Sequence, residues 1–363
     1  MRGFRNPYQQ VTMRICFMND NFYRSSGAAI AIRRISESMT GVDCFFAACT
    51  GENLEEDVSW MPAERFERFD LKTSNALTLF REIRRFKKWF RANGIDLAHC
   101  HHRRVASVLH VAGVPVLYTG QLVFPYEFWF RWLRPSKMTA ITPTVAKNLL
   151  ETTGVRVLAC IGNPAPFPEA PPEIDLDRVS TRAVCIARLD PVKGHVHLLH
   201  AWKILHDRGF RYELDLIGEG KLQPELEKQA ARDGISELVH FCGFTKDVSA
   251  AVRRGLFAVL VSEYEGQGIV TLEAAAMGRP SLLTAVPGSI DLIPEGALLP
   301  NGIPFGDPLA LANALQEWFA HPEAIVQDGR LFFNTLKTGS DATLVAKHYR
   351  QIYMQILGNT LTG

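Results

Sequence analysis

The sequence predicts an α/β protein of two doubly wound domains that face each other across a cleft, each a parallel sheet with helices on both faces. Short apolar runs rich in β-branched residues alternate with helical segments along the chain. With 363 residues, the chain also exceeds the usual size of a single hydrophobic core. Five prolines between Gly162 and Pro172 interrupt the alternation and indicate a linker.

These observations divide the chain into five segments. We expect a disordered tail over residues 1–12, a first domain over 13–165, a linker over 166–181, a second domain over 182–340, and a final helix with a tail over 341–363.

Composition and charge describe a globular protein whose two halves differ. Hydrophobic residues make up 47% of the chain, and the net charge is +2. Residues 1–165 carry 22 Lys and Arg against 14 Asp and Glu, whereas residues 166–363 carry 18 against 24. Because excess positive charge attracts anionic partners, we expect the first half to meet something anionic.

The cysteines and the first residues predict a cytoplasmic protein. The seven cysteines show no CxxC spacing and lie mostly in apolar runs, which is typical of buried reduced thiols. Residues 1–12 lack the apolar core of a signal peptide, and no apolar segment is long enough to span a bilayer.

The first domain opens with a strand over residues 13–18, a polar loop, and a helix from about residue 28 to residue 39. A dinucleotide fingerprint would need G-x-G-x-x-G in this loop, but only Gly27 is present. Gly27 either lets the backbone approach a sugar or phosphate closely or belongs to a plain turn. We do not expect a dinucleotide here.

Two later segments combine basic and apolar residues. A helix over residues 79–91 has an apolar face (residues 79, 80, 83, 86 and 90) and carries basic residues elsewhere, among them Arg84, Arg85, Lys87 and Lys88. Residues 124–137 hold six aromatics, including Phe128, Trp129 and Trp132, among three basic residues. The first segment would also be explained by a solvated surface helix, and the second by an irregular helix of the core. Taken together, however, the two segments favour a face that binds an anionic membrane.

Three histidines lie at the end of another expected strand, within residues 96–104. Further strands are expected over residues 114–119 and 138–142. His99 and His101 share one face of that strand, and His102 takes the other. A metal site would need a further ligand that the sequence does not offer, so we expect none. Ligands bind at the carboxyl ends of strands in α/β sheets, and we expect one or two of these histidines to line the cleft.

In the second domain, consecutive strand ends carry glycine or basic residues. Arg188 and Lys193 follow the strand over 183–187, where a guanidinium fork and an ammonium suit a phosphate clamp. Gly218 and Gly243 follow the next two strands. Such an edge fits a ligand of nucleotide size.

The fourth strand end holds the most distinctive stretch of the chain. An apolar strand over 256–261 leads through Gly266 and Gly268 into a helix that stops before Pro280. This arrangement directs unpaired backbone N–H groups at an anion. Glu265 and Glu273 bracket the turn, which suits a ligand that carries both phosphates and hydroxyls.

In their order, these segments resemble the retaining glycosyltransferases of family 4. The likeness rests on Arg188-Leu-Asp-Pro-Val-Lys-Gly194, Gly218-Glu-Gly220, the Phe241-Cys-Gly243 turn, and the E-x7-E pattern from Glu265 to Glu273. It is strong over residues 182–290 and weak over 13–165. The resemblance implies the GT-B fold, with two Rossmann-like domains and a C-terminal helix that crosses back to the first. Residues 344, 345, 348, 352 and 356 would form the apolar stripe of that helix.

The resemblance also implies roles for individual residues. Arg188 and Lys193 would bind the donor's phosphates, Glu273 the ribose, and Glu265 the donor sugar. The backbone of Gln267, Gly268 and Ile269 would meet the sugar and pyrophosphate, with Gly243 and Phe244 near the base.

One position departs from the family pattern. A histidine commonly lies two residues after a strand-end threonine of the first domain, but here Gln121 follows Thr119. Glutamine can bond a hydroxyl but cannot accept a proton at neutral pH. Either Gln121 only positions the sugar, or His101 takes over, or the activity is altered.

The sequence therefore predicts a retaining, metal-independent glycosyltransferase without a cofactor, at the inner face of the cytoplasmic membrane. It would move a hexose-type sugar from a UDP- or GDP-sugar to a lipid-linked or growing surface glycan, and it would not bind nucleic acid. One alternative is a sugar-nucleotide epimerase of the same fold. The other is a non-catalytic nucleotide-sugar-binding protein.

Overall fold

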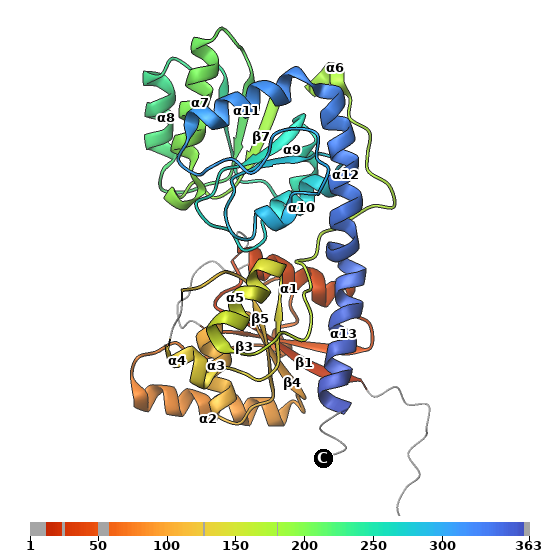
Figure 1. The fold of residues 1–363 in the computed structure, drawn as a ribbon. Helices are drawn as coiled ribbons and strands as arrows, with labels where there is room; N and C mark the ends of the chain where they lie inside the picture. The colour runs from red at the N-terminus through yellow and green to blue at the C-terminus, as the bar shows by residue number, and fades with distance from the viewer. Residues whose placement is uncertain (1–11, 24–25, 50–57, 126–127, 180, 359–363) are drawn as a thin grey trace, which may run out of the picture. The chain divides into compact units, whose positions relative to one another are not determined.

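The computed structural model describes residues 12–23, 26–49, 58–125, 128–179 and 181–358 (Figure 1). The chain divides into two compact units. The first comprises residues 1–141, 146–161 and 343–363, and the second comprises residues 142–145 and 162–342. Apart from Thr12, the tail expected over residues 1–12 lies outside the described residues.

The first unit is built on a parallel sheet with strand order β3-β2-β1-β4-β5-β6. Its strands are β1 (Met13–Asn19), β2 (Val42–Ala48), β3 (Phe66–Arg68), β4 (Leu97–Cys100), β5 (Val116–Gly120) and β6 (Met138–Ala140). Its helices are α1 (Gly27–Ser38), α2 (Ala76–Ala92), α3 (Arg103–Val111), α4 (Phe128–Leu133), α5 (Pro143–Thr153) and α13 (Ala342–Gly358).

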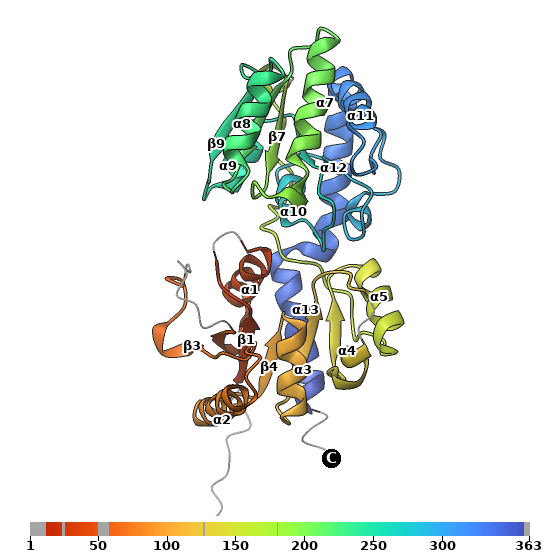
Figure 2. The same ribbon diagram turned by 90° about the vertical axis from the view of Figure 1, so that its left-hand side faces the viewer.

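Helices cover both faces of this sheet (Figure 2). On β2, Phe46 packs into the core that holds α1 and α13, with Ile32 and Tyr353 among its members. Its neighbour Phe45 points the other way and contacts Trp89 of α2, at 6.1 Å between ring centroids. Alternate side chains of a strand thus serve opposite layers, as a doubly wound sheet requires.

The second unit repeats the design with strand order β11-β10-β7-β8-β9. Its strands are β7 (Arg182–Ile186), β8 (Glu213–Ile217), β9 (Val239–Gly243), β10 (Phe257–Leu260) and β11 (Ser281–Leu283). Its helices are α6 (Leu176–Val179), α7 (His195–Asp207), α8 (Gln223–Arg232), α9 (Val248–Val252), α10 (Ile269–Ala276), α11 (Pro308–Ala320) and α12 (Pro322–Ser340).

Two layers of apolar residues again enclose the sheet. Cys185 of β7 belongs to the core with α7, α8 and α11, where Trp202 and Trp318 are fully buried. Val184, the neighbour of Cys185, packs with Ala274 of α10 on the opposite face. The prediction of two doubly wound domains is therefore confirmed.

The last helix belongs to the first unit, as predicted, but its buried face differs from the predicted stripe. Val345, Ile352 and Ile356 are buried. Leu344 and His348 are exposed instead, and the tyrosines at 349 and 353 take their places in the core. The stripe 345-349-352-356 keeps helical spacing, and tyrosine can join it because its hydroxyl finds partners inside the sheet.

Those partners form a buried polar network around His99. The His99 Nδ1 lies 2.7 Å from the Tyr353 hydroxyl, and its Nε2 lies 2.7 Å from the Thr119 hydroxyl. Thr119 in turn contacts the Thr139 hydroxyl at 2.7 Å. Burial and the neighbouring His101 hold the pKa of His99 well below its usual range, so the ring is neutral. The network ties α13 to strands β4, β5 and β6.

Within the described part of the chain, no helix is both long and apolar enough to cross a membrane. The seven cysteines are free thiols: Cys16, Cys49, Cys100 and Cys185 are buried, Cys44 is half-buried, and Cys160 and Cys242 are exposed. Burial raises the pKa of the Cys185 thiol to about 12, which leaves it unreactive at neutral pH.

We predict that Tyr353→Phe destabilises the protein by about 1–3 kcal/mol, because it leaves the buried His99 Nδ1 without a partner. Urea unfolding followed by circular dichroism measures the change. Tyr349→Phe is the matched control: its hydroxyl contacts Thr119 at the longer distance of 3.3 Å, so the loss should be smaller. Equal stability of Tyr353→Phe and the wild type would contradict the structural role of the network.

Candidate functional site

The strand order of the second sheet locates a binding edge. The chain runs outward from β7 through β8 to β9, then returns to place β10 and β11 on the other side of β7. The point where the order reverses lies between the carboxyl ends of β7 and β10, and open α/β sheets bind ligands there. The predicted Arg188–Lys193 segment follows β7, and Glu265 follows β10.

The structure brings two of the predicted residues into direct contact at this point. The Lys193 ammonium pairs with Glu265 Oε1, although the two residues lie 72 positions apart. The Ser262 hydroxyl donates to the same carboxylate oxygen at 2.9 Å. The side chains of Lys193 and Glu265 are only 19% and 12% exposed. A cation and a carboxylate are thus held together at the carboxyl ends of β7 and β10.

Glycine makes this approach possible. Gly194 follows the short 3-10 turn Pro191–Lys193 with φ of 66°, a conformation that other residues rarely adopt. A Cβ at this position would overlap the carbonyl oxygen of Val261, which directly follows β10. The backbone N–H of Glu263 also donates to the Val192 carbonyl at 2.8 Å. The two loops therefore act as one backbone-linked structure.

Arg188 lies at the same strand end but takes another partner. Its guanidinium pairs with the Asp190 carboxylate at 2.7 Å, and its side chain is 55% exposed. The structure does not bring Arg188 into the Lys193–Glu265 pair. Its guanidinium remains accessible to solvent after the end of β7.

Helix α10 begins immediately after the glycine turn. Gly268 is its N-cap residue, so the first N–H groups of the helix point toward the strand edge. Gln267 turns its side chain to the start of the second unit, where its Oε1 accepts the Asn163 N–H at 2.5 Å. Glu273 is buried on the helix at 5% exposure. The helix N-terminus adds a positive dipole end to the site.

The other predicted glycines line the adjacent strand ends. Gly218 has φ of 145° and lies against the Ala187 carbonyl, so a side chain there would displace the end of β7. Its N–H donates to the Gly243 carbonyl at 2.8 Å, next to half-buried Phe244. The Leu189 N–H donates to the Glu219 carbonyl at 3.0 Å. These bonds place the ends of β7, β8 and β9 side by side.

In the first unit, the order reverses between β1 and β4, and His101 directly follows β4. Gln121, at the end of β5, places its amide nitrogen 2.9 Å from His101 Nδ1. Burial lowers the pKa of His101 to about 3, so it is neutral and a weak base at physiological pH. The predicted Gly27 opens α1 and is exposed.

The basic residues of the predicted membrane face differ in their contacts. Arg84 and Lys88 are exposed. Arg85, however, pairs with Glu82 at 2.9 Å and with Glu67 at 3.5 Å, and Lys87 donates to the Ala112 carbonyl at 2.8 Å. The last two cations therefore serve the structure of the first unit.

The exposure of the apolar residues predicted for this face also varies. Phe80 was expected on the inner face of its helix, and that expectation is wrong: the side chain is 58% exposed, because it lies 100° around the helix from Leu79. Trp129 and Trp132 are 36% and 67% exposed. The side chain of Phe128 lies outside the described residues.

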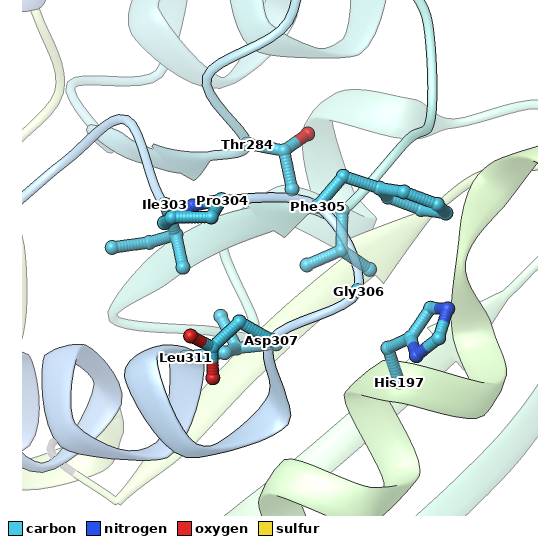
Figure 3. Close-up of a pocket in the computed structure, with 9 residues that line it drawn as sticks. His197, Thr284, Ile303, Pro304, Phe305, Gly306, Asp307 and Leu311 are labelled. Atoms are coloured by element: carbon cyan, nitrogen blue, oxygen red, sulfur yellow. The ribbon is translucent and has the colours of Figure 1, made fainter.

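The sequence did not point to a small pocket at the same edge of the second sheet (Figure 3). It is lined by Val261 and Thr284 after β10 and β11, by residues 303–307, and by His197 and Leu311. The His197 and Phe305 rings meet at 5.0 Å and 82°. Phe305 also lies close to Gly194, so this wall supports the Lys193 loop from behind. The glycines and prolines between residues 300 and 308 are sequence signals for such a loop, although they do not indicate a pocket.

Among the described residues, no group of three or more His, Cys, Asp or Glu side chains is arranged to hold a metal ion. The positive groups identified at the strand edge of the second unit are Lys193, Arg188 and the α10 N-terminus.

Comparison with known proteins gives matches concentrated in the second unit. Residues 180–321 match the family model described as "Glycosyl transferases group 1". The putative glycosyltransferase EpsF of Bacillus subtilis is 34% identical over 99 residues, 27% of this chain and 26% of EpsF. The alpha-D-kanosaminyltransferase of Streptomyces kanamyceticus is 32% identical over 143 residues, 38% of this chain and 36% of that enzyme. The matched parts thus span only about a quarter to a third of these relatives.

Solved structures resemble the chain over nearly its whole length. A glycosyltransferase from Rickettsia africae has a TM-score of 0.78 at 14% identity, covering 96% of this chain and 99% of that one. Anabaena Alr3699/HepE in complex with UDP-glucose has a TM-score of 0.74 at 16% identity, covering 96% and 99%. At this identity the likeness shows the fold alone, and it confirms the predicted GT-B fold.

We predict that Gly194→Ala destabilises the protein by at least about 2 kcal/mol, through left-handed strain and the overlap with Val261. Gly209→Ala is the matched control, since Gly209 has φ of 90° with nothing within 4 Å of a new Cβ. It should cost only the strain of about 1–2 kcal/mol. Chemical unfolding compares the two variants. A Gly194→Ala loss no greater than that of the control would refute the close approach of the two loops.

Proposed function

We propose that this protein is a retaining glycosyltransferase that moves a hexose-type sugar from a UDP- or GDP-sugar to an acceptor hydroxyl. The observation that carries the proposal is the assembly of Lys193, Glu265 and the α10 N-terminus at the reversal point of the second sheet. The family match over residues 180–321 supports it, because this segment contains all three. The UDP-glucose complex of a structural relative supports the donor class.

The charges at the site suit departure of a nucleoside diphosphate. As the bond between the anomeric carbon and the phosphate oxygen breaks, positive charge grows on the sugar and negative charge on the pyrophosphate. Lys193, Arg188 and the α10 N-terminus would stabilise the pyrophosphate. We expect the reaction to be independent of metal ions because these groups supply the positive charge.

The Lys193–Glu265 pair suggests how the site responds to its donor. Glu265 neutralises Lys193, and the Ser262 hydroxyl donates to the same carboxylate. A pyrophosphate would compete for the ammonium and release Glu265 to accept hydrogen bonds from sugar hydroxyls. Glu273 would bind the ribose hydroxyls. The acceptor hydroxyl would attack the face that the phosphate leaves and give its proton to a leaving phosphate oxygen, so that the configuration is retained.

The exposed side of α2 suggests that the acceptor is a lipid-linked or growing surface glycan at an anionic membrane. At helical spacing, Leu77 and Phe80 begin a stripe that continues with the exposed cations Arg81, Arg84, Lys88 and Arg91. Leu77 is 79% exposed, and the Arg84 guanidinium lies 5.6 Å from the Phe80 ring. Apolar and basic groups on one helix side suit the boundary of an anionic membrane.

We predict that Lys193→Met weakens UDP or GDP binding about tenfold or more, since an ammonium–phosphate contact is lost. Glu265→Gln should retain nucleotide affinity but lose turnover, because it frees Lys193 and removes the sugar contact. Isothermal titration and nucleotide release from a panel of UDP- and GDP-sugars measure both effects. Lys203→Met, which removes an exposed cation paired with Asp207 on α7, is the control.

Three results would count against this proposal. If Lys193→Met bound UDP and GDP as tightly as the wild type, the proposed phosphate contact of Lys193 would be rejected. Donor isomerisation without an acceptor would indicate an epimerase. Nucleotide-sugar binding without turnover under any acceptor would indicate a binding protein.

We predict that neutralising Arg84 and Lys88 to Gln reduces sedimentation with phosphatidylserine vesicles about tenfold or more, at about 1 kcal/mol per cation. The control replaces Lys228 and Arg232, two exposed cations of α8 in the second unit, with Gln. Vesicle binding unchanged by the first pair would reject the α2 membrane face. An equal loss of vesicle binding in the two double variants would show that the vesicles attract the protein through its net charge alone.

A further inference from the structure

A second pocket of the second unit lies at the other edge of its sheet, away from the Lys193–Glu265 pair. The strands are parallel, so their amino ends share one edge, and the pocket adjoins Gly278 just before β11. Its volume is about 150 Å³. We call it the linker pocket, and it is lined by Pro171, Pro172, Glu173, Ile174, Gly278, Val326 and Arg330.

Close backbone contacts build the walls of the linker pocket. Gly278 has φ of 71°, and a Cβ there would lie 3.0 Å from the Pro172 carbonyl oxygen. A Cβ at Gly329 of α12 would overlap the Gly278 carbonyl, and α10 and α12 pack side by side (Figure 1). The Lys337 ammonium of α12 donates to the Pro168 carbonyl at 2.7 Å. The linker, the end of α10 and α12 are therefore fixed to one another around the pocket.

A buried arginine adjoins this pocket. Arg279 follows Gly278 in the chain and is 3% exposed. Its Nη1 donates to the Met277 carbonyl at 2.7 Å and lies 3.5 Å from the carbonyl oxygen of Glu173. Its Nε has no hydrogen-bond partner among the residues that the structure describes. The carbonyls at the end of α10 offset part of the charge, but a buried cation usually faces an opposite charge as well.

The charged groups around Arg279 do not supply that opposite charge. Burial and the neighbouring Arg253 lower the pKa of Arg279 to about 10, so the guanidinium is still charged at neutral pH. Arg253 and Arg330 are exposed, and neither side chain forms an ion pair with another described residue. The carboxylate that lines the pocket belongs to Glu173, which is exposed and likewise unpaired within the described part of the chain. Cations therefore outnumber carboxylates here.

We propose that the linker pocket binds a phosphoryl group, which pairs with Arg330 and offsets the buried charge of Arg279. Guanidinium groups match the geometry of phosphate oxygens. Where the phosphate belongs to a sugar ester, Glu173 accepts hydrogen bonds from the sugar hydroxyls. This site is separate from the carboxyl ends of β7 and β10, so the inference goes beyond the proposed function and does not depend on it.

Calorimetric titration of the full-length protein tests the site with two probes, inorganic phosphate and glucose 6-phosphate. Arg330→Met should weaken the binding of both about tenfold or more, because a charged hydrogen bond is lost. Glu173→Gln should lower the ratio of glucose 6-phosphate affinity to phosphate affinity about fivefold, as expected for one hydrogen bond. Arg232→Met, which removes an exposed cation of α8, is the control and should bind both probes normally. Lys193→Met should also bind them normally.

The part played by Arg279 has its own measurement. In the full-length protein labelled with ¹⁵N-arginine, the Nε–H signal of Arg279 is assigned by its absence in Arg279→Lys. Burial should keep this proton visible, and binding of glucose 6-phosphate should shift the signal. A guanidinium that only caps α10 would give the same signal with and without the probe, and that result would reject the role of Arg279.

The outcomes separate this site from the site of the proposed function. Absence of phosphate and glucose 6-phosphate binding, or unchanged affinity in Arg330→Met, overturns the linker pocket as a phosphoryl site. Loss of binding in Lys193→Met but not in Arg330→Met also overturns it, because the probes then occupy the Lys193 loop. Equal affinity for the two probes in the wild type upholds the phosphoryl site and rejects the sugar contact of Glu173. Thermal unfolding of each variant confirms that it is folded.

Discussion

The close approach of the loops after β7 and β10 is the constraint on which the candidate site depends. Gly194 lets the backbone lie against the Val261 carbonyl, and the Glu263 N–H then reaches the Val192 carbonyl. In this arrangement Lys193 pairs with Glu265, and α10 begins a few residues later at the same edge. A cation, a carboxylate and a helix N-terminus therefore converge because two backbones touch.

The two units use the same topology for different chemistry. Each sheet reverses its strand order once, and each reversal point holds polar side chains. In the second unit these are ionic, which suits phosphates and developing charge. In the first unit, burial keeps His99 and His101 uncharged and hydrogen bonds orient them, while Asp20, directly after β1, pairs with Lys72 at 2.7 Å.

Local patterns in the sequence predicted the sheets, the glycine turns and Lys193 and Glu265 as site residues, because strand ends and helix starts are read from neighbouring residues. Contacts between distant side chains could not be read in this way. The Lys193–Glu265 and Gln121–His101 pairs depend on which strands become neighbours. Likewise, Arg85 and Lys87 looked equivalent to Arg84 and Lys88 until Glu82 and the Ala112 carbonyl were placed beside them.

The most direct test of the central claim is the anomeric configuration of the product formed from a nucleotide sugar. Proton NMR can follow the reaction of the wild-type protein with UDP- and GDP-sugars and a panel of glycan acceptors. The account predicts release of the nucleoside diphosphate and a product with the donor's anomeric configuration. An inverted product, or no release from any donor that binds, would contradict it.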